Sequence, residues 1–507
     1  MPFVNASEWT PPKRVQVVVI GSGAGGAVAA ARLAAAGFEV VVLEEGGHYQ
    51  KRNFRMREDD AFPQLYQESG TRATKDLGIA ILQGRAVGGS TVINWTTSFR
   101  TPDSVLEHWE KVHGVREFSP AELRPHFEAI EARLNIQPIP LEESNRNNRL
   151  LWDGCEKLGY SIEVTKRNVK NCFRSGYCGM GCPVDAKQSM LVTYLPEAVE
   201  HGATVVSRCR VDRLRTDGDR VVSVECSELS EAGPTGRQLS LAADRVVLAG
   251  GAINTPAVLL RSGLADELTG RRTFLHPVIA TSARFREPVQ AYYGAPQSVA
   301  SHHFAHRGDR AGFFLEAAPA HPMMLALAAT GFGEAHRSTM VELPHLSAHL
   351  AIAVDGFSPE ETGGTVQLRP SGAPVLDYVL PPRIWEALEE GLRALVRVDL
   401  AAGAEWVQTG HDPALRISSE GALASLEDHP LGPGKVAVFS AHVMGGAMVG
   451  EAGRSVVRSG DLRHHRINNL HISDGSVFPT SLGVNPQETI YGIAHLVSER
   501  WTQSWKA

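Results

Sequence analysis

The sequence has few of the features that mark secreted, membrane-spanning or nucleic-acid-binding proteins. Its 6 cysteines in 507 residues are too few for a disulfide framework. No run approaches the roughly 18 consecutive apolar residues that a transmembrane helix needs, and the start MPFVNASEWTPPKRV lacks the apolar core of a signal peptide. A net charge of -6 offers no electrostatic basis for binding nucleic acid. We therefore expect a soluble cytoplasmic protein, for which peripheral contact with a membrane remains open.

What is present is the composition of an ordinary globular protein. The hydrophobic fraction is 43% and the charged fraction 21%, and 49 glycines indicate many close backbone approaches. The length suits two or three domains, or one large two-domain unit. No internal repeat is evident.

The N-terminal segment has the pattern of a dinucleotide-binding unit. RVQVVVI, residues 14–20, predicts a buried parallel strand, and an alanine-rich helix follows that ends near Gly37. A second strand, FEVVVLE, ends in the acidic residue Glu44. Between the first strand and the helix stands GSGAGG, whose motif glycines are Gly21, Gly23 and Gly26.

Each part of this unit has a physical task. Gly21 permits the tight turn, Gly23 lets the backbone approach a pyrophosphate, and Gly26 lets the helix pack on the strand. The helix N-terminus at Ala24 directs free N–H groups and the positive end of its dipole toward the phosphates. Glu44 would accept hydrogen bonds from a ribose. The unit predicts a dinucleotide site but does not distinguish FAD from NAD.

Two more glycine-rich segments resemble the signatures of the glucose-methanol-choline (GMC) oxidoreductase family. Gly84–Asn94 follows the pattern G-R-x-V-G-G-S-T-x-I-N, and Gly251–Gly263 follows G-A-x-x-T-P-x-x-L-L-x-S-G. The chain departs from the usual continuations at Ser98-Phe99 and Leu264-Ala265. The resemblance covers most of the chain and is weakest over residues 276–430. It implies an FAD cofactor and the oxidation of alcohols.

The resemblance also implies cofactor contacts. A loop carrying Arg85, Gly88, Gly89 and Ser90 would bring backbone N–H groups close to the flavin, because larger side chains would block the approach. Some relatives have a histidine at the position of Asn94 and link it covalently to FAD, so Asn94 predicts non-covalent FAD. In CRVDRL, Val211 is the candidate for a backbone contact with adenine.

The C-terminal segment supplies the candidate catalytic residues. LHISDGSVFP should return to the FAD-binding sheet and place Asp474 and Gly475 near the flavin, and Pro486 should open a final helix whose dipole points to the ring. His442, in SAHVMGGAMVG, and Asn485 match the two positions that face the reactive edge of the flavin in the family.

The chemistry of alcohol oxidation explains these residue types. Hydride leaves the carbinol carbon more easily as the hydroxyl proton departs, so a neutral imidazole is a suitable general base. An amide donor can then stabilise the developing alkoxide. A core histidine bonded to a carbonyl is the alternative interpretation of His442. Four further histidines form no metal-binding motif and receive no role: His302, His303, His306 and His321.

A glycine-rich loop, NCFRSGYCGMGCP, contains Cys172, Cys178 and Cys182. Three thiolates could hold an iron–sulfur cluster, and similar spacing occurs in flavin subunits of some multi-component sugar dehydrogenases of the family. Long-chain alcohol oxidases carry a similar loop followed by P-x-x-A-K-x-S, matched here by the segment Pro183–Ser189, which includes Lys187. Three buried free thiols in a structural loop are the alternative.

The order of these segments predicts a mixed α/β fold. We assign residues 1–105, 190–275 and 430–507 to a Rossmann-type FAD-binding domain. Residues 106–189 and 276–429 would form a substrate domain with an antiparallel sheet backed by helices. Within it, TVQLRPSGAPVLDYVL predicts a hairpin and IWEALEEGLRALVRVDL an amphipathic helix.

Three functions follow as hypotheses. The favoured one is an FAD-dependent alcohol oxidase or dehydrogenase acting on an apolar or long-chain alcohol, with His442 as base and Asn485 as its partner. Oxygen, a quinone or a cytochrome would reoxidise the flavin. The others are a non-oxidative lyase on the same fold, and the flavin subunit of an electron-transfer complex with an iron–sulfur cluster.

Overall fold

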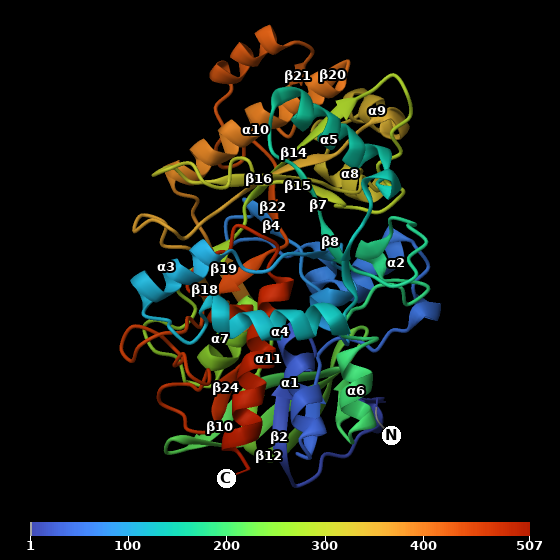
Figure 1. Ribbon diagram of the computed structural model, residues 1–507. Helices are drawn as coiled ribbons and strands as arrows, with labels where there is room; N and C mark the ends of the chain where they lie inside the picture. The colour runs from blue at the N-terminus through green and yellow to red at the C-terminus, as the bar shows by residue number, and fades with distance from the viewer. Residues whose placement is uncertain (1–2, 507) are drawn as a thin grey trace.

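The computed structural model describes residues 3–506 and contains two large sheets, one in each half of the molecule (Figure 1). The eight-stranded sheet of the lower half has the order β1-β9-β3-β2-β12-β11-β10, with β24 beside β12. Its strands are β1 (Phe3–Asn5), β2 (Arg14–Ile20), β3 (Val40–Leu43), β9 (Thr204–Ser207), β10 (Cys209–Asp217), β11 (Arg220–Ser230), β12 (Gly233–Leu248) and β24 (Leu470–Ile472). Both ends of the described chain lie in this half (Figure 1).

The expected strand–glycine–helix–strand unit forms the centre of this sheet. β2 pairs in parallel with β3 on one side and with β12 on the other, and its valines are buried on both faces. Helix α1 (Ala24–Ala35) packs against α6 (Tyr194–Glu200) and against the C-terminal helix α11 (Gln487–Ser504). The predicted return of the C-terminal segment is confirmed, because β24 pairs with β12.

The upper sheet has nine strands in the order β21-β20-β14-β17-β16-β15-β7, with β22 paired to β14 and β4 paired to β22. All its pairings are antiparallel except that of β4 with β22. The strands are β4 (Ile79–Ile81), β7 (Glu163–Val164), β14 (Val278–Arg284), β15 (Val299–Ser301), β16 (Phe313–Ala317), β17 (His349–Ala353), β20 (Trp406–Thr409), β21 (Arg416–Ile417) and β22 (Val438–Ser440).

Helices back this sheet, as predicted. α10 (Pro382–Ala402) lies across β14, β16 and β17, and α5 (Arg146–Leu158) packs beside it. The four apolar positions of α10 that the sequence places on one face are all buried: Ile384, Leu388, Leu392 and Leu395. The predicted hairpin forms as β18 (Thr365–Leu368) and β19 (Pro374–Asp377).

Strands β4 and β22 connect the two halves. In sequence, β4 lies between β3 and β9 of the lower sheet and β22 lies between β12 and β24. The two strands pair in parallel with each other, and Leu82 N–H donates to the carbonyl of Ser440 at 2.9 Å. β4 leads directly to Gly84, and β22 ends two residues before His442. The remaining α-helices are α2 (Glu58–Leu65), α3 (Asp103–His113), α4 (Pro120–Arg133), α7 (Gly251–Arg261), α8 (Pro322–Ala328) and α9 (Glu334–Val341).

The mixed α/β architecture is therefore that expected from the sequence. Within residues 3–506, no helix combines the length and apolarity that crossing a bilayer requires.

Candidate active site

A cavity of about 780 Å³ extends from the glycine-rich turn of the lower sheet to the strands of the upper sheet. Fourteen of the predicted site residues line it, which means that segments far apart in sequence meet in one space. They are Gly21, Gly23, Ala24, Glu44, Arg85, Gly89, Ser90, Asn94, Val211, His442, Asp474, Gly475, Asn485 and Pro486. Gly26 and Gly88 are buried beside the cavity without lining it.

Glycine is required where the first motif packs on its neighbours. Gly21 has φ of 102°, and a Cβ there would lie 2.7 Å from the carbonyl carbon of Ala249. A Cβ at Gly26 would meet the carbonyl oxygen of Gly21 and the side chain of Ala249, so the close packing of this helix on the strand requires glycine. At Gly23, by contrast, a Cβ would meet only the Cα of Gly89, at 3.8 Å, because this side opens to the cavity.

Gly23 is also the N-cap of α1 and provides no side chain to cap it. The first N–H groups of α1 therefore lie at the cavity wall with the positive end of the helix dipole, an arrangement that favours an anion.

The Glu44 carboxylate is held mainly by protein donors. Its Oε2 accepts from the N–H of Ser22 at 3.0 Å and from the Ser22 hydroxyl at 2.7 Å, and its Oε1 accepts from Gly46 N–H at 2.8 Å. Burial raises its pKa, and these donors partly offset that rise. A carboxylate can accept about four hydrogen bonds, so capacity remains for the predicted ribose contact.

The second glycine loop touches the first. The Gly88 N–H donates to the Ser22 hydroxyl at 2.9 Å, which leaves it unable to face a flavin directly. The Asn94 side chain donates to Gln487 Oε1 at 2.6 Å, whereas its own Oδ1 is buried without a partner in the described chain. An unpaired amide oxygen at a cavity wall is ready to accept from a bound group.

At the reacting end, His442 and Asn485 lie side by side. Asn485 Nδ2 is 3.3 Å from Nε2 of His442, and Asn485 Oδ1 is buried without a partner among residues 3–506. His276 faces the other side of the imidazole, with the two Nδ1 atoms 3.0 Å apart. Burial lowers the pKa of His442 to about 4 and lowers that of His276 well below its usual value. Both rings are thus neutral at neutral pH.

Sequence reasoning gave no role to three polar residues at this site, His276, Gln297 and Glu316. His276 follows β13 (Thr273–Leu275), Gln297 lies just before β15, and Glu316 lies within β16. Lys187, which the sequence showed only as part of the motif after the cysteine loop, lies behind the flavin loop. Glu316 had one local signal, an acidic residue inside the apolar run FFLEAA. The Lys187 ammonium is fully buried and donates to the carbonyls of Val92, Asn94 and Cys178 at 2.6, 2.8 and 2.6 Å.

The cysteine loop lies against two buried cations, Arg167 and Lys187. Each thiol accepts a hydrogen bond of 3.4 Å, Cys172 from Arg174 N–H, Cys178 from the Arg167 guanidinium and Cys182 from Lys187 N–H. All three are free thiols, and burial raises the pKa of Cys172. The iron–sulfur hypothesis stays a prediction.

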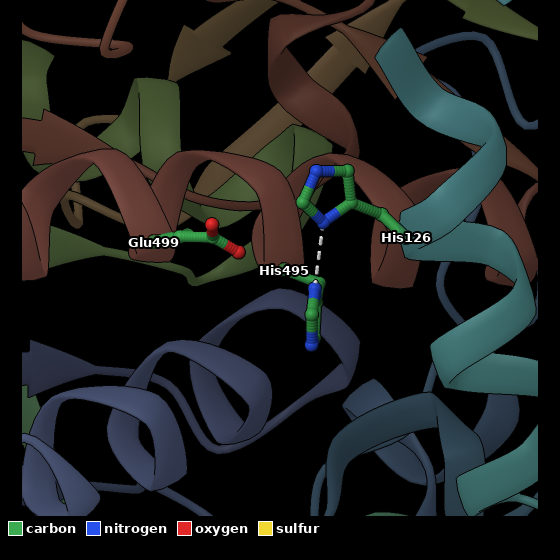
Figure 2. Close-up of side chains that lie close together, drawn as sticks. All are labelled: His126, His495 and Glu499. Carbon is green, nitrogen blue, oxygen red and sulfur yellow. Dashed lines mark hydrogen bonds between the residues drawn. The ribbon is translucent and has the colours of Figure 1, made fainter. Parts of the chain in front are cut away.

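A second cluster of titratable groups lies outside the cavity. Figure 2 shows His126 of α4 turned toward His495 of α11, with Glu499 on the same face of α11. The two Nδ1 atoms are 2.8 Å apart and the three side chains bring ligand atoms within 4.8 Å of one another. The guanidinium of Arg32 pairs with Glu499 at 3.5 Å. We interpret the cluster as a polar link between α1, α4 and α11, since Arg32 already occupies the carboxylate.

The cavity fits the FAD that the family resemblance implies. It combines a glycine cradle at an uncapped helix N-terminus, an acidic residue after the second strand, and unpartnered amide oxygens on Asn94 and Asn485. The cavity is lined by polar groups and glycines at the end where a nucleotide would bind, and mainly by apolar side chains where it reaches the upper sheet.

Comparison with known proteins agrees with this geometry. The family model described as GMC oxidoreductase matches residues 62–278 with its N-terminal part and 359–494 with its C-terminal part, and an NAD(P)-binding Rossmann-like model matches 19–50. An uncharacterized GMC-type oxidoreductase of Mycobacterium tuberculosis is 33% identical over 96% of this chain and 76% of its own length. A long-chain-alcohol oxidase of Arabidopsis thaliana is 29% identical over 97% of this chain and 68% of its own.

Solved structures show the same fold at low sequence identity. Pyridoxine 4-oxidase from Mesorbium loti has a TM-score of 0.72 and 19% identity, covering 96% of this chain and 99% of that one. A formate oxidase has a TM-score of 0.72 and 15% identity, covering 98% of this chain and 100% of that one.

Proposed function

The chain belongs to the GMC oxidoreductase family and is an FAD enzyme that oxidises CH–OH donors, and within that activity we propose that its substrate is an apolar, long-chain primary or secondary alcohol. The observation that carries this proposal is the cavity wall beyond His442 and Asn485. It is built mainly from large apolar side chains: Ile93, Trp95, Val278, Met324, Leu350, Ile352 and Phe439. A wall of this kind gains free energy by burying an alkyl chain.

The roles of the polar residues follow from their places. His442, neutral and buried, accepts the hydroxyl proton as general base, and the amide of Asn485 donates to the developing alkoxide. FAD, when bound non-covalently, supplies the acceptor, at N5 of its ring, for the hydride that leaves the carbinol carbon. The product is the aldehyde or ketone.

Cofactor contacts are proposed on the same geometry. The pyrophosphate would lie at Gly23 and Ala24, the ribose at Glu44, and adenine at the backbone of Val211, which lies in β10 at the far end of the cavity. Asn94 has an amide rather than an imidazole, which supports non-covalent FAD. Oxygen is the proposed electron acceptor, supported by relatives named as oxidases.

The test is anaerobic mixing of the FAD-loaded protein with a series of primary and secondary alcohols of increasing chain length. We expect the flavin to bleach, with an apparent Kd that falls as the chain lengthens. A His442→Ala variant should retain FAD and lose bleaching by about 10²- to 10⁴-fold. If no alcohol bleaches the flavin, the result would contradict alcohol oxidation and favour the lyase hypothesis. Equal rates for short and long alcohols would contradict the substrate class.

One observation favours the iron–sulfur alternative as a second candidate. Arg167 and Lys187 are buried beside Cys178, and no carboxylate forms an ion pair with either in the part of the chain that the structure describes. Buried cations need compensating negative charge, which a thiolate-bound cluster would supply, and N–H donors to each sulfur suit such a ligand. Iron and sulfide analysis of anaerobically purified protein decides between a cluster and free thiols.

A further inference from the structure

Glu316 is a carboxyl group that lines the cavity near Asn485, and it lies in β16. Its cross-strand neighbours are Ala300 on β15 and Leu350 on β17, so nothing charged stands beside it on the sheet. The residue is 0% exposed. Because side chains alternate along a strand, Glu316 faces the cavity while Leu315 and Ala317 face the opposite side of the sheet.

The hydrogen bonding of Glu316 is incomplete. Gln297 Nε2 donates to its Oε2 at 2.5 Å, and the Thr97 hydroxyl holds that glutamine by donating to its Oε1 at 2.8 Å. Oε1 of Glu316 and Oδ1 of Asn485 both lack partners within residues 3–506. The unpaired carboxyl oxygen of Glu316 can carry a proton and then donate a hydrogen bond, whereas the amide oxygen of Asn485 can only accept one.

The charge environment leads to the same conclusion. No lysine or arginine pairs with Glu316 in the described chain, and an isolated buried carboxylate is costly. Burial raises the pKa of Glu316 to about 8, although the neighbouring amides of Asn485 and Gln297 pull it down in part. The other titratable groups at this end, His442 and His276, have lowered pKa values and stay neutral. The buried His349–Asp399 pair lies on the α10 side of the sheet.

We propose that Glu316 is a catalytic residue of the alcohol oxidation proposed above: as a neutral acid, it donates a hydrogen bond to the substrate oxygen while His442 removes the hydroxyl proton. This inference rests on the proposed function. A carboxylate would repel the negative charge that develops on that oxygen, whereas a protonated carboxyl group stabilises it together with the amide of Asn485.

The sign of the pH dependence follows from this role. The active form of Glu316 is protonated, so the rate of flavin reduction falls as pH rises through the pKa of about 8. Glutamine keeps an N–H donor of similar shape but cannot ionise. In Glu316→Gln, the alcohol should therefore reduce the flavin at all pH values, without the fall in rate at alkaline pH. Glu316→Ala loses the donor and should be slower by about 10²-fold.

The experiment measures anaerobic flavin reduction by a long-chain primary alcohol as a function of pH, with Asp355→Asn as the matched control. Asp355 is another buried carboxyl group whose pKa is raised by burial to about 8, but it does not line the cavity. The control should keep the wild-type pH profile. An alkaline fall that persists unchanged in Glu316→Gln, or an unaltered rate in Glu316→Ala, would overturn the proposal.

A second readout is independent of turnover. Infrared difference spectra of the FAD-loaded protein across the same pH range should show titrating carboxylic acids, and Glu316→Gln and Asp355→Asn should each remove a different component of this signal. A carboxylic acid signal that is the same in Glu316→Gln as in the wild type would also overturn the proposal. If no alcohol reduces the flavin of the wild-type protein, the proposed function itself is rejected. If alcohols reduce it but the Glu316 variants behave like the wild type, only the role of Glu316 is rejected.

Discussion

Two neighbouring glycines of the first motif allow fold stability to be separated from cofactor binding. At Gly25, in the first turn of α1, a Cβ would lie 2.6 Å from the carbonyl carbon of Ser473 and closer still to its oxygen. Backbone on both sides must move, and overpacking of this kind costs about 3 kcal/mol. At Gly23, φ is −72° and the nearest atom to a Cβ is 3.8 Å away. Alanine there fits the protein without strain.

Gly23→Ala should instead obstruct the cofactor. The added methyl group would occupy the space where we place the pyrophosphate, at the N–H groups of α1. Losing two charge-assisted hydrogen bonds costs about 3 kcal/mol, which is roughly a hundredfold in Kd. Gly25→Ala should lower the free energy of unfolding of the apoprotein, whereas Gly23→Ala should leave it unchanged and weaken FAD binding.

Urea unfolding of both apoproteins and fluorescence titration with FAD measure the two effects. Unchanged FAD affinity in Gly23→Ala would refute the placement of the phosphates. An apoprotein destabilised equally by both substitutions would refute the assignment of open space at Gly23. The two variants thus test the packing role of Gly25 separately from the cofactor contact of Gly23.

Three further predictions concern the reacting end and the loop behind it. Because the pKa of His442 is lowered to about 4, flavin reduction should stay constant from neutral pH down to about pH 5 and decline only below that; a fall centred on the ordinary histidine pKa of about 6.5 would contradict the environment described. Lys187→Met leaves three buried carbonyls without a donor and should destabilise the protein by about 3 kcal/mol in urea unfolding, together with a loss of FAD, while Lys187→Arg should restore part of both. Cys178→Ser should abolish any iron in anaerobically purified protein if the cluster exists, and should leave the flavin spectrum unchanged if the thiols are structural.

The sequence was most informative where structure and function are local. Gly21, Gly23, Gly26 and Glu44 lie within one strand–helix–strand unit, so their contacts follow from short-range geometry. The pairing of β24 with β12 was predictable because the family resemblance named the segment. The contacts of Gly21, Gly23 and Glu44 with FAD stay predictions, and so do the domain boundaries.

Residues of the upper sheet were harder to predict. Glu316 reaches the cavity because β16 pairs with β15 and β17, and Gln297 lies just before β15; strand pairing across long separations leaves no local pattern. His276 was missed for the same reason, since its partner His442 lies 166 positions later in the chain. A single acidic residue in an apolar strand was the available signal for Glu316.

The parallel pairing of β4 with β22 has a consequence for how this enzyme can change. β4 leads into the second glycine loop and β22 leads to His442, so main-chain hydrogen bonds set the spacing between cofactor loop and imidazole. The side chain of Leu350, which lines the far wall, takes no part in the pairing of β4 with β22. New substrate ranges can therefore be selected by exchanging wall residues while the alignment of donor carbon and ring is inherited intact.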